Sequence, residues 1–570
     1  MKNIYQRRPT LSATITYSDK PWLKHYDKDV PHSISYEKIC LPEKLEAIAN
    51  KYPEKTALMF MGYKMSYREL VVMRDKFATC LADFGIQKGD RVAILLPNII
   101  PCVVAYCAIL KIGGIVVMNN PLYTDRELEH QFNDSGSKVL VTLDLLATRM
   151  VNLRPKTSIK QIVYSSIGDY LPFPKNLLFP LVAKKKKMAA DVAPGESLFK
   201  WKDIIAKYPP NPPKVAITHD DIAMLQYTGG TTGVSKGVML SHGNLIKQYQ
   251  VLKAWNTMVK EGDNEIMLGA LPFFHIFGIS CSMNLAMCGG WTTVLVPKPQ
   301  PKELLETMRK FKPTFAPLVP TMLIGMINHE DMAKTDLSCI KGCFSGSAPL
   351  PVEIMKTFAE KTGTNISEGF GMTESSPVTH SNPFNGLRKV GSIGIPVPDT
   401  DCRIVSLDDG ETDMPVGETG ELLIKGPQVM QGYWNRPDAT RDTVKDGWLY
   451  TGDIARMDED GYFYIVDRKK DMIISGGYNV YPRDIDEVFY EHPKVEEACA
   501  IGIPHDVRGE QVKVFVVLKA GQTATEQELI EFCKDKLAKY KLPTSIEFRD
   551  QLPKSTVGKI LRKELRKDTK

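Results

Sequence analysis

A short segment rich in glycine, threonine and lysine constrains this chain most. Residues 227–237 read Tyr-Thr-Gly-Gly-Thr-Thr-Gly-Val-Ser-Lys-Gly, and they follow a strand-like run at 222–226. Glycines let backbone N–H groups turn toward an anion, threonine hydroxyls add donors, and a lysine adds positive charge. The segment therefore predicts a phosphate-binding loop at the end of a strand, although a flexible surface turn can have the same composition.

The loop differs from the common P-loop of nucleotide-binding proteins. That pattern requires Gly directly before Lys, whereas Ser235 precedes Lys236 here. The segment therefore indicates a different chemistry on nucleotides.

Further motifs follow along the chain, most of them combining glycine with hydroxyl or charged residues. They lie at residues 345–349, 368–374, 450–453, 467–471, 475–479 and 553–560. In this order they resemble the adenylate-forming superfamily of acyl-CoA synthetases, luciferases and peptide-synthetase adenylation domains, from roughly residue 40 to the C-terminus. With Gly229 where many relatives have Ser, the loop looks most like that of bacterial long-chain fatty-acyl-CoA ligases.

The composition is that of a globular protein with more than one domain. The chain has 570 residues, 43% hydrophobic and 25% charged, and its net charge of +6 is too small to suggest a nucleic-acid partner. Its 11 cysteines have no metal-ligand spacing, and Cys80, Cys102, Cys107 and Cys281 lie in apolar surroundings. We therefore expect buried thiols in a reducing cytosol.

The most hydrophobic run, residues 92–110, could be taken for a membrane span. Pro97, Asn98 and Pro101 interrupt it, so we expect a strand at 91–96, a helix from Pro101 to Gly113, and a strand at 115–118. Such a βαβ unit belongs inside an α/β domain. Because residues 1–10 also lack the apolar core of a signal peptide, we expect a cytoplasmic protein.

The periodicity predicts a large α/β domain at 1–469 and a small α+β domain at 470–570. Strand-like and helical runs alternate over 50–400, and short strands at 391–405 and 420–424 indicate a small β-subdomain. The helices expected in the large domain are 43–49, 67–84 and 242–255. The small domain is expected to contain strands at 495–503, 511–519 and 545–548 and a helix at 526–540. The resemblance implies that this domain is a mobile lid.

One segment, from Tyr170 to Lys187, departs from the globular pattern. It is apolar and proline-rich, and it ends in four consecutive lysines, Lys184 to Lys187. Apolar anchors beside a basic cluster are typical of reversible contact with an anionic membrane, here the inner face. A solvated loop with some leucines packed on the domain is the alternative.

The resemblance implies a two-step reaction that uses ATP, Mg²⁺ and coenzyme A. The carboxylate of a fatty acid attacks the α-phosphate of ATP, which gives an acyl-adenylate and pyrophosphate, and a thiol then displaces AMP. The first transition state gathers charge on phosphate oxygens, so it requires preorganised donors and a metal ion. The implied phosphate-binding residues are Thr228, Gly229, Gly230, Thr231, Thr232, Gly233, Lys236 and Thr373, and Glu374 is the implied Mg²⁺ ligand.

The resemblance also implies which residues bind the nucleoside of ATP. The residues implied for adenine are Ser347, Ala348, Pro349, Gly369, Phe370 and Gly371. Most relatives carry Tyr at the position of Phe370, and Phe keeps the stacking face while losing a hydroxyl. Asp453 and Arg468 resemble the pair that binds the ribose hydroxyls, although a surface ion pair is the alternative for them.

The remaining assignments concern the acyl group, the thiol and the hinge. Lys559 matches the lysine that bridges the substrate carboxylate and the α-phosphate, unless it belongs only to the solvated cationic tail. His275 is expected to lie near the reacting carbonyl as a neutral imidazole, or simply to pack between aromatic rings. Gly476, Gly477 and Tyr478 are implied for coenzyme A, and Lys470 for the hinge between the domains.

Several alternatives share these motifs. A medium-chain or aryl acid ligase, a luciferase-like oxygenase or an adenylating enzyme with another acceptor would carry the same residues. A non-catalytic nucleotide-binding or membrane-scaffold protein is disfavoured, because Lys236, Glu374 and Lys559 are all present. Neither the acyl chain length nor the oligomeric state follows from the sequence.

Overall fold

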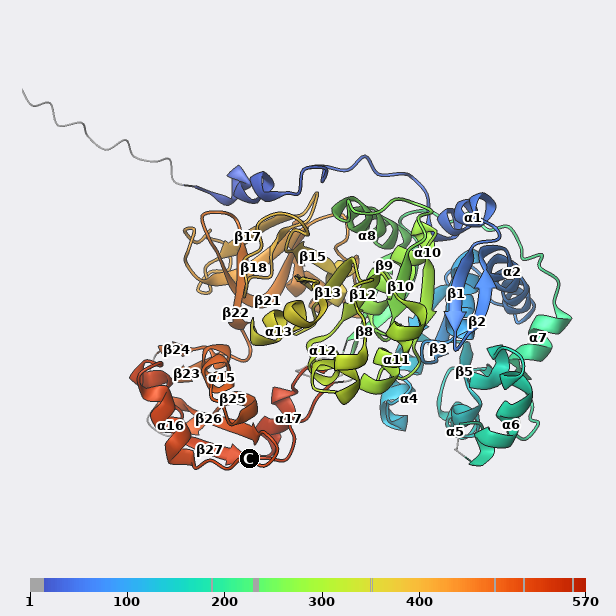
Figure 1. The fold of residues 1–570 in the computed structure, drawn as a ribbon. Coiled ribbons are helices and arrows are strands. Elements are labelled where there is room, and N and C mark those ends of the chain that lie inside the picture. The colour runs from blue at the N-terminus through green and yellow to red at the C-terminus, as the bar shows by residue number, and fades with distance from the viewer. Residues whose placement is uncertain are drawn as a thin grey trace, which may run out of the picture.

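The computed structural model of the chain describes residues 15–185, 188–228, 235–348, 350, 352–475, 478–505, 508–555 and 558–569. Two sheets, each mostly parallel, form the body of the molecule (Figure 1). The first sheet runs, in spatial order, through β16 (Ile395–Pro396), β15 (Val378–Ser381), β14 (Ile366–Gly371), β13 (Gly342–Ser345), β12 (Phe315–Leu318), β10 (Ile266–Gly269), β11 (Thr292–Leu295), β1 (Thr56–Phe60) and β2 (Tyr63–Ser66). The second runs through β19 (Gly432–Tyr433), β9 (Lys236–Ser241), β8 (Ile222–Thr228), β4 (Ile115–Met118), β3 (Arg91–Leu95), β5 (Val139–Leu143), β6 (Gln161–Ser165) and β7 (Leu198–Lys200).

Helices cover these sheets, which explains the continuous apolar runs of the inner strands. The helices of this part are α1 (Leu41–Lys51), α2 (Tyr67–Asp83), α3 (Ile100–Lys111), α4 (Asp125–Ser135), α5 (Asp144–Leu153), α6 (Lys175–Lys185), α7 (Trp201–Lys207), α8 (His242–Trp255), α9 (Ile276–Gly278), α10 (Leu285–Gly289), α11 (Pro301–Phe311), α12 (Pro320–Ile327), α13 (Val352–Thr362) and α14 (Pro437–Thr443). The expected helices at 43–49, 67–84 and 242–255 are confirmed as α1, α2 and α8. Helix α8 begins where Ser241 accepts a hydrogen bond from the backbone N–H of Asn244, an N-cap that fixes its first turn.

The hydrophobic run at 92–110 is a strand and an interior helix, as expected. β3 pairs in parallel with β4 and β5, and every residue of α3 except Lys111 is buried. Pro101 lies in the first turn of α3, where its missing N–H costs no hydrogen bond. Among the described residues, no helix has both the length and the apolar character needed to cross a membrane.

Two smaller sheets complete the fold. The third contains β17 (Asp401–Val405), β18 (Gly420–Lys425), β21 (Trp448–Met457) and β20 (Val444–Lys445), with β22 (Phe463–Arg468) paired to β21. The fourth contains β24 (Tyr478–Val480), β23 (Ile473–Ser475), β26 (Gly509–Leu518) and β25 (Val495–His505), with β27 (Ser545–Phe548) paired to β26. Helices α15 (Pro482–Tyr490), α16 (Glu526–Lys534) and α17 (Arg562–Lys567) join the fourth sheet in the unit drawn red in Figure 1.

The fourth sheet has a hydrophobic core of its own. Buried apolar residues between Ile473 and Ile546 pack on one another, apart from the large core that joins the other sheets. One expectation here is wrong: the helix predicted at 526–540 ends at Lys534. Pro543 disfavours helical geometry just before it, and Leu537 packs against the small core instead of continuing the helix.

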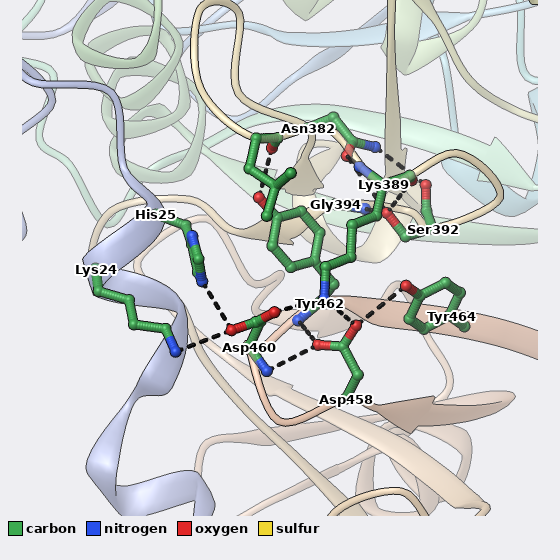
Figure 2. A network of polar contacts seen from close by, with 11 residues as sticks. Lys24, His25, Asn382, Lys389, Ser392, Gly394, Asp458, Asp460, Tyr462 and Tyr464 are labelled. Atoms are coloured by element: carbon green, nitrogen blue, oxygen red, sulfur yellow. Dashed lines mark hydrogen bonds and ion pairs between the residues drawn. The ribbon is translucent and has the colours of Figure 1, made fainter.

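An N-terminal arm, residues 15–40, crosses the top of the molecule before α1 (Figure 1). Its first part forms the short 3-10 helices η1 (Tyr17–Asp19) and η2 (Pro21–His25). Lys24 and His25 contact Asp460 in the turn between β21 and β22, with N–O distances of 3.0 and 3.3 Å (Figure 2). The arm is thus fastened to the third sheet.

Lys389 completes this anchor from the loop before β16. Its ammonium lies 2.6 Å from Asp458 and 2.9 Å from Asp460 (Figure 2). Burial opposes the charge of Lys389, but the hydrogen bonds to the two carboxylates outweigh it and raise the pKa of Lys389 to about 12. Lys389 therefore stays charged at physiological pH.

The segment between β6 and β7 contains the helix α6, which we did not expect from so proline-rich a sequence. Phe173, Leu177 and Leu178 on and before this helix are 78%, 64% and 55% exposed. Lys186 and Lys187 lie outside the described residues, as do the side chains of Lys184 and Lys185. The described part of this segment therefore presents apolar side chains to solvent.

Candidate active site

A cavity of about 1730 Å³ lies where the strands of both large sheets end and the small C-terminal unit meets them. Cationic side chains outnumber carboxylates on its walls, so it is suited to an anionic ligand. The predicted site residues that line it are Thr228, Lys236, His275, Ser347, Gly369, Phe370, Gly371, Thr373, Glu374, Arg468, Lys470 and Lys559. Residues separated by more than three hundred positions in the sequence are thus brought to one place.

Some predicted residues lie elsewhere or cannot be placed. Gly229, Gly230, Thr231, Thr232, Gly233, Pro349, Gly476 and Gly477 lie outside the described residues. Ala348 is absent from the described cavity walls, and Tyr478 is 58% exposed on the small unit, where it stacks on Tyr540. Asp453 lines a smaller pocket that shares Arg468 and Lys470 with the large one.

The predicted phosphate loop connects two antiparallel strands. β8 ends at Thr228, and β9 begins at Lys236, directly opposite it in the register. This pairing brings Thr228 and Lys236 together at the cavity wall. The backbone carbonyl of Ser235 lies 3.1 Å from Nε2 of His130 on α4, which fixes the end of the loop.

Glu374 is held by Tyr433, a residue that the sequence did not single out. The Tyr433 hydroxyl donates a hydrogen bond of 2.8 Å to Oε1 of Glu374, and the backbone N–H of Met430 donates to the Glu374 carbonyl. The ammonium of Lys236 lies 4.7 Å from the centre of the Tyr433 ring, a cation–π contact. Tyr433 therefore orients both predicted phosphate-side residues.

The surroundings of Glu374 fit a Mg²⁺ ion shared with phosphates. Mg²⁺ is usually held by one or two carboxylates together with substrate phosphates. Among the described residues no group of three or more His, Cys, Asp or Glu side chains could hold a metal ion alone. A single carboxylate beside Lys236 matches a metal that arrives with its nucleotide.

Asp453 and Arg468 lie directly opposite each other on β21 and β22. Nε of Arg468 lies 3.3 Å from Oδ1 of Asp453, and Asp453 is only 4% exposed. Gly452, with φ of 68°, turns the strand so that its carbonyl accepts from the N–H of Lys469. Asp453 and Arg468 therefore form an ion pair, and both line the smaller pocket.

The C-terminal tail delivers Lys559 to the cavity. Gly558 has φ of 78°, and a Cβ there would lie 2.3 Å from the Thr321 hydroxyl of α12. The tail thus docks so closely on the large domain that only glycine fits. Thr321 was not predicted, since nothing in the sequence marks a threonine that another domain will touch.

Three groups at this end of the cavity have strongly lowered pKa values. Burial, reinforced by the Arg468 cation, lowers the pKa of Lys559 to about 7 and that of Lys470 to about 8. Burial and the nearby Lys559 lower the pKa of His275 to about 4, so this imidazole is neutral, as expected. Nδ1 of His275 accepts a 3.3 Å hydrogen bond from the Phe277 N–H, so the ring's proton resides on Nε2.

The cysteines have no role in this site beyond packing. All of them are free thiols, and all except Cys339 are buried. Burial raises the pKa of the Cys281 thiol on the cavity wall, so it is not a thiolate at neutral pH. The expectation of inert, buried cysteines is confirmed.

Two family models match the chain. The model described as AMP-binding enzyme matches residues 45–434, and the AMP-binding enzyme C-terminal domain matches residues 484–559. The chain belongs to the AMP-binding enzyme family. The resemblance drawn from the motifs is therefore confirmed.

Curated relatives span nearly the whole chain. A long-chain-fatty-acid–CoA ligase of Bacillus subtilis is 46% identical over 555 residues, covering 96% of this chain and 98% of the relative. A ligase of the same description from Yersinia pestis is 40% identical over 556 residues, covering 96% and 98%. The similarity to these ligases therefore extends over the sequence between the motifs as well as over the motifs themselves.

The fold agrees with solved structures of this family. The crystal structure of ATP-bound MatB from Rhodopseudomonas palustris superposes with a TM-score of 0.81 at 29% identity, covering 93% of this chain and 99% of that chain. The predicted fold class, a large α/β domain followed by a small α+β domain, is confirmed.

The lowered lysine pKa values predict that nucleotide binding takes up protons. At pH 8 Lys559, with a pKa of about 7, is mostly neutral in the free protein. Phosphate anions favour its charged form and raise its pKa, so binding ATP must draw a proton from solvent. Titration calorimetry in buffers of different ionisation enthalpy is expected to show greater proton uptake at pH 8 than at pH 6. Lys559→Met should remove part of the uptake at pH 8; an unchanged value would contradict this assignment.

Proposed function

We propose that this chain is a long-chain fatty-acid–CoA ligase that converts fatty acid, ATP and coenzyme A into acyl-CoA, AMP and pyrophosphate. The observation that carries the proposal is one cavity whose walls combine cationic side chains, among them Lys236, Arg468 and Lys559, with an apolar set that we call the apolar branch: Leu252, Trp255, Phe277, Cys281, Leu285, Phe344 and Phe384. Phosphates would bind to the cations and an alkyl chain to the apolar branch. The names of the curated relatives support the same activity.

In the first step a carboxylate oxygen of the fatty acid would attack the α-phosphorus of ATP, and the bond to the pyrophosphate oxygen would break. Lys236 and the loop 228–233 would hold the β- and γ-phosphates, and Thr373 would donate to the α-phosphate. Lys559 would lie between the two anions and reduce their repulsion. Glu374, oriented by Tyr433, would hold Mg²⁺, which when bound neutralises charge on the phosphates.

The nucleoside would bind to residues at the ends of β13 and β14 and on β21 and β22. Phe370 would stack on adenine, with Gly369 and Gly371 allowing close approach, and Ser347, Ala348 and Pro349 would lie beneath. Asp453 would accept hydrogen bonds from the ribose hydroxyls while Arg468 keeps its carboxylate in place. Neutral His275 would border the carboxylate without trapping it, since it carries no charge to pair with.

In the second step the sulfur of coenzyme A would attack the acyl carbonyl carbon, AMP would leave with the bridging oxygen, and the thiol proton would pass to solvent. This step has no use for Lys559 in the cavity. We assign a large domain to 1–469 and a mobile lid to 470–570, with Lys470 as the hinge. Rotation about Lys470 would withdraw Lys559 and bring Gly476, Gly477 and Tyr478 to the pantetheine arm.

A pyrophosphate-release screen with acids of increasing length tests the substrate class. Each buried methylene stabilises the bound acid by about 0.8 kcal/mol, so kcat/KM is expected to rise with chain length until the apolar branch is filled. Release of acyl-CoA should require coenzyme A. A preference for acetate or benzoate over dodecanoate would refute the long-chain assignment.

Lys559→Ala is expected to abolish adenylation and largely spare thioester formation from supplied acyl-adenylate. Losing a charged contact made in the transition state costs roughly 3–4 kcal/mol, about a hundredfold to a thousandfold in rate. Each half-reaction is measured alone. Lys534→Ala, an exposed lysine on α16 paired with Glu531, is the matched control.

A hinge at Lys470 predicts the opposite effects on the two half-reactions. Lys470→Pro fixes φ and should block thioester formation while leaving adenylation active. If either variant lost both half-reactions equally, its residue would not be specific to one step: Lys559 to adenylation, or Lys470 to thioester formation.

We also propose that the segment from Tyr170 to Lys187 holds the enzyme reversibly on an anionic membrane, where fatty acids dissolve. The exposed Phe173, Leu177 and Leu178 support an apolar contact, and the four lysines supply charge. Each lysine near an anionic surface contributes about 1 kcal/mol, screened by salt.

Vesicle sedimentation tests this contact. Wild type is expected to pellet with anionic vesicles at low salt, whereas replacing Lys184 to Lys187 by Glu, or Leu177 and Leu178 by Ser, should leave it in the supernatant. Leu387→Ser, at a leucine 48% exposed elsewhere on the surface, is the matched control. Wild type that never pellets would favour the solvated-segment alternative.

A further inference from the structure

We propose that Trp255 is the end wall of the apolar branch and limits the length of the fatty acid, and that Tyr26 of the N-terminal arm holds the indole in place. This inference rests on the proposed ligase function, and it assigns chain-length control to residues outside the adenylation machinery.

The direction of the branch follows from one continuous helical segment. α9, the π-helical segment η5 (Ile279–Asn284) and α10 succeed one another without a break, directly after His275. Phe277, Cys281 and Leu285 line the cavity at intervals of four residues, so they form one stripe that leads away from the reacting end. A π-helical turn is a rare feature that is often found at functional sites.

The stripe gives the branch an approximate length. From His275 to Leu285 the segment advances at most roughly 15 Å, the value for an α-helix at about 1.5 Å per residue, because the wider π-helical turns of η5 rise less. An extended chain advances roughly 1.2 Å per bond, so the stripe can border up to about a dozen carbons. An acyl chain of greater length would end against a wall beyond Leu285.

Helix α8 supplies that wall. Leu252 and Trp255, three residues apart on one helical face, line the same cavity, and Trp255 is the last residue of the helix. Trp255 is 3% exposed, so its indole is packed on the sides away from the cavity. On this proposal, the face of α8 that carries Leu252 and Trp255 closes the branch beyond Leu285, because α8 packs against both η5 and α10.

The N-terminal arm packs behind the indole. The rings of Tyr26 and Trp255 meet edge to face, with centroids 5.3 Å apart at 88°. The Tyr26 hydroxyl donates a 2.8 Å hydrogen bond to the Pro396 carbonyl, which fixes the ring. The contacts of Lys24 and His25 with Asp460 fasten the arm just before Tyr26 (Figure 2).

The arm also holds a second aromatic of the cavity wall. The carboxylate of Asp27 accepts hydrogen bonds of 3.0 and 3.1 Å from the backbone N–H groups of Phe384 and Asn385. Phe384 lines the cavity and packs edge to face on Phe344. Adjacent residues of one arm, Tyr26 and Asp27, therefore support two parts of the apolar branch.

A wall that is packed on every side except the one facing the cavity does not yield to a longer ligand. Extra methylenes forced against a packed interior are strained rather than accommodated, with losses of roughly 5- to 150-fold in affinity. The chain-length profile of wild type should thus rise to a sharp cut-off. The residue that sets the cut-off is Trp255.

The test is the chain-length profile of pyrophosphate release with saturated acids from dodecanoate to tetracosanoate. Trp255→Ala is expected to move the cut-off to longer acids, with kcat/KM rising about fourfold for each methylene newly buried. Trp291→Ala is the matched control, because Trp291 is also 3% exposed but does not line the cavity. It should lower stability without moving the cut-off.

Two further variants keep the proposal open to refutation if Trp255→Ala folds poorly. Leu252→Phe narrows the same wall and should move the cut-off to shorter acids. Tyr26→Ala should extend the accepted length by acting on KM for the longest acids, with kcat for dodecanoate retained. An unchanged cut-off in Trp255→Ala and Leu252→Phe overturns the proposal while leaving the ligase function intact. Wild type that activates no fatty acid overturns the function itself, and this inference with it.

Discussion

Repulsion between two anions is the constraint that this structure is arranged around. A carboxylate must approach a phosphate that already carries negative charge, and water would keep them apart. The cavity gathers Lys236, Arg468, Lys470 and Lys559 around one space. Burial and the neighbouring cations lower the pKa values of Lys470 and Lys559, so these two lysines become fully protonated only when an anion binds.

The cations around the cavity come from different elements of the fold. The β8–β9 pairing brings Lys236, the β21–β22 pairing brings Arg468, and the tail that docks on Thr321 brings Lys559. Each is held by backbone geometry rather than by a flexible loop, which keeps the donors oriented before substrate binds. Of the three, only Lys559 belongs to a unit with a separate core, so the proposed rotation of that unit would withdraw Lys559 and leave Lys236 and Arg468 in place.

Much of this could be predicted from the sequence, because local patterns decide local structure. The strand, helix and strand at 91–118 and the helix at 242–255 follow from apolar periodicity, proline and capping residues. Some motif residues, such as Lys236, Phe370 and Glu374, line the cavity, whereas Tyr478 lies exposed on the small unit. Tyr433 and Thr321 were missed because their roles come from contacts with residues far away in the chain, Glu374 and Gly558. The helix at 526–540 was overextended because helix-forming residues continue after Lys534, whereas the packing of Leu537 on the small core, which local sequence does not reveal, ends the helix there.

The N-terminal arm has a consequence for how the chain reaches this fold. Lys24 and its partner Asp460 are 436 positions apart, so the arm leaves the ribosome long before the turn that receives it exists. At roughly 5–20 residues per second, the arm waits on the order of half a minute or more with Tyr26 unsupported. Closing so long a stretch of chain costs entropy, so we expect this contact to form after the sheets have assembled. On this expectation, an arm that is among the first parts to be synthesised is among the last parts of the large domain to pack.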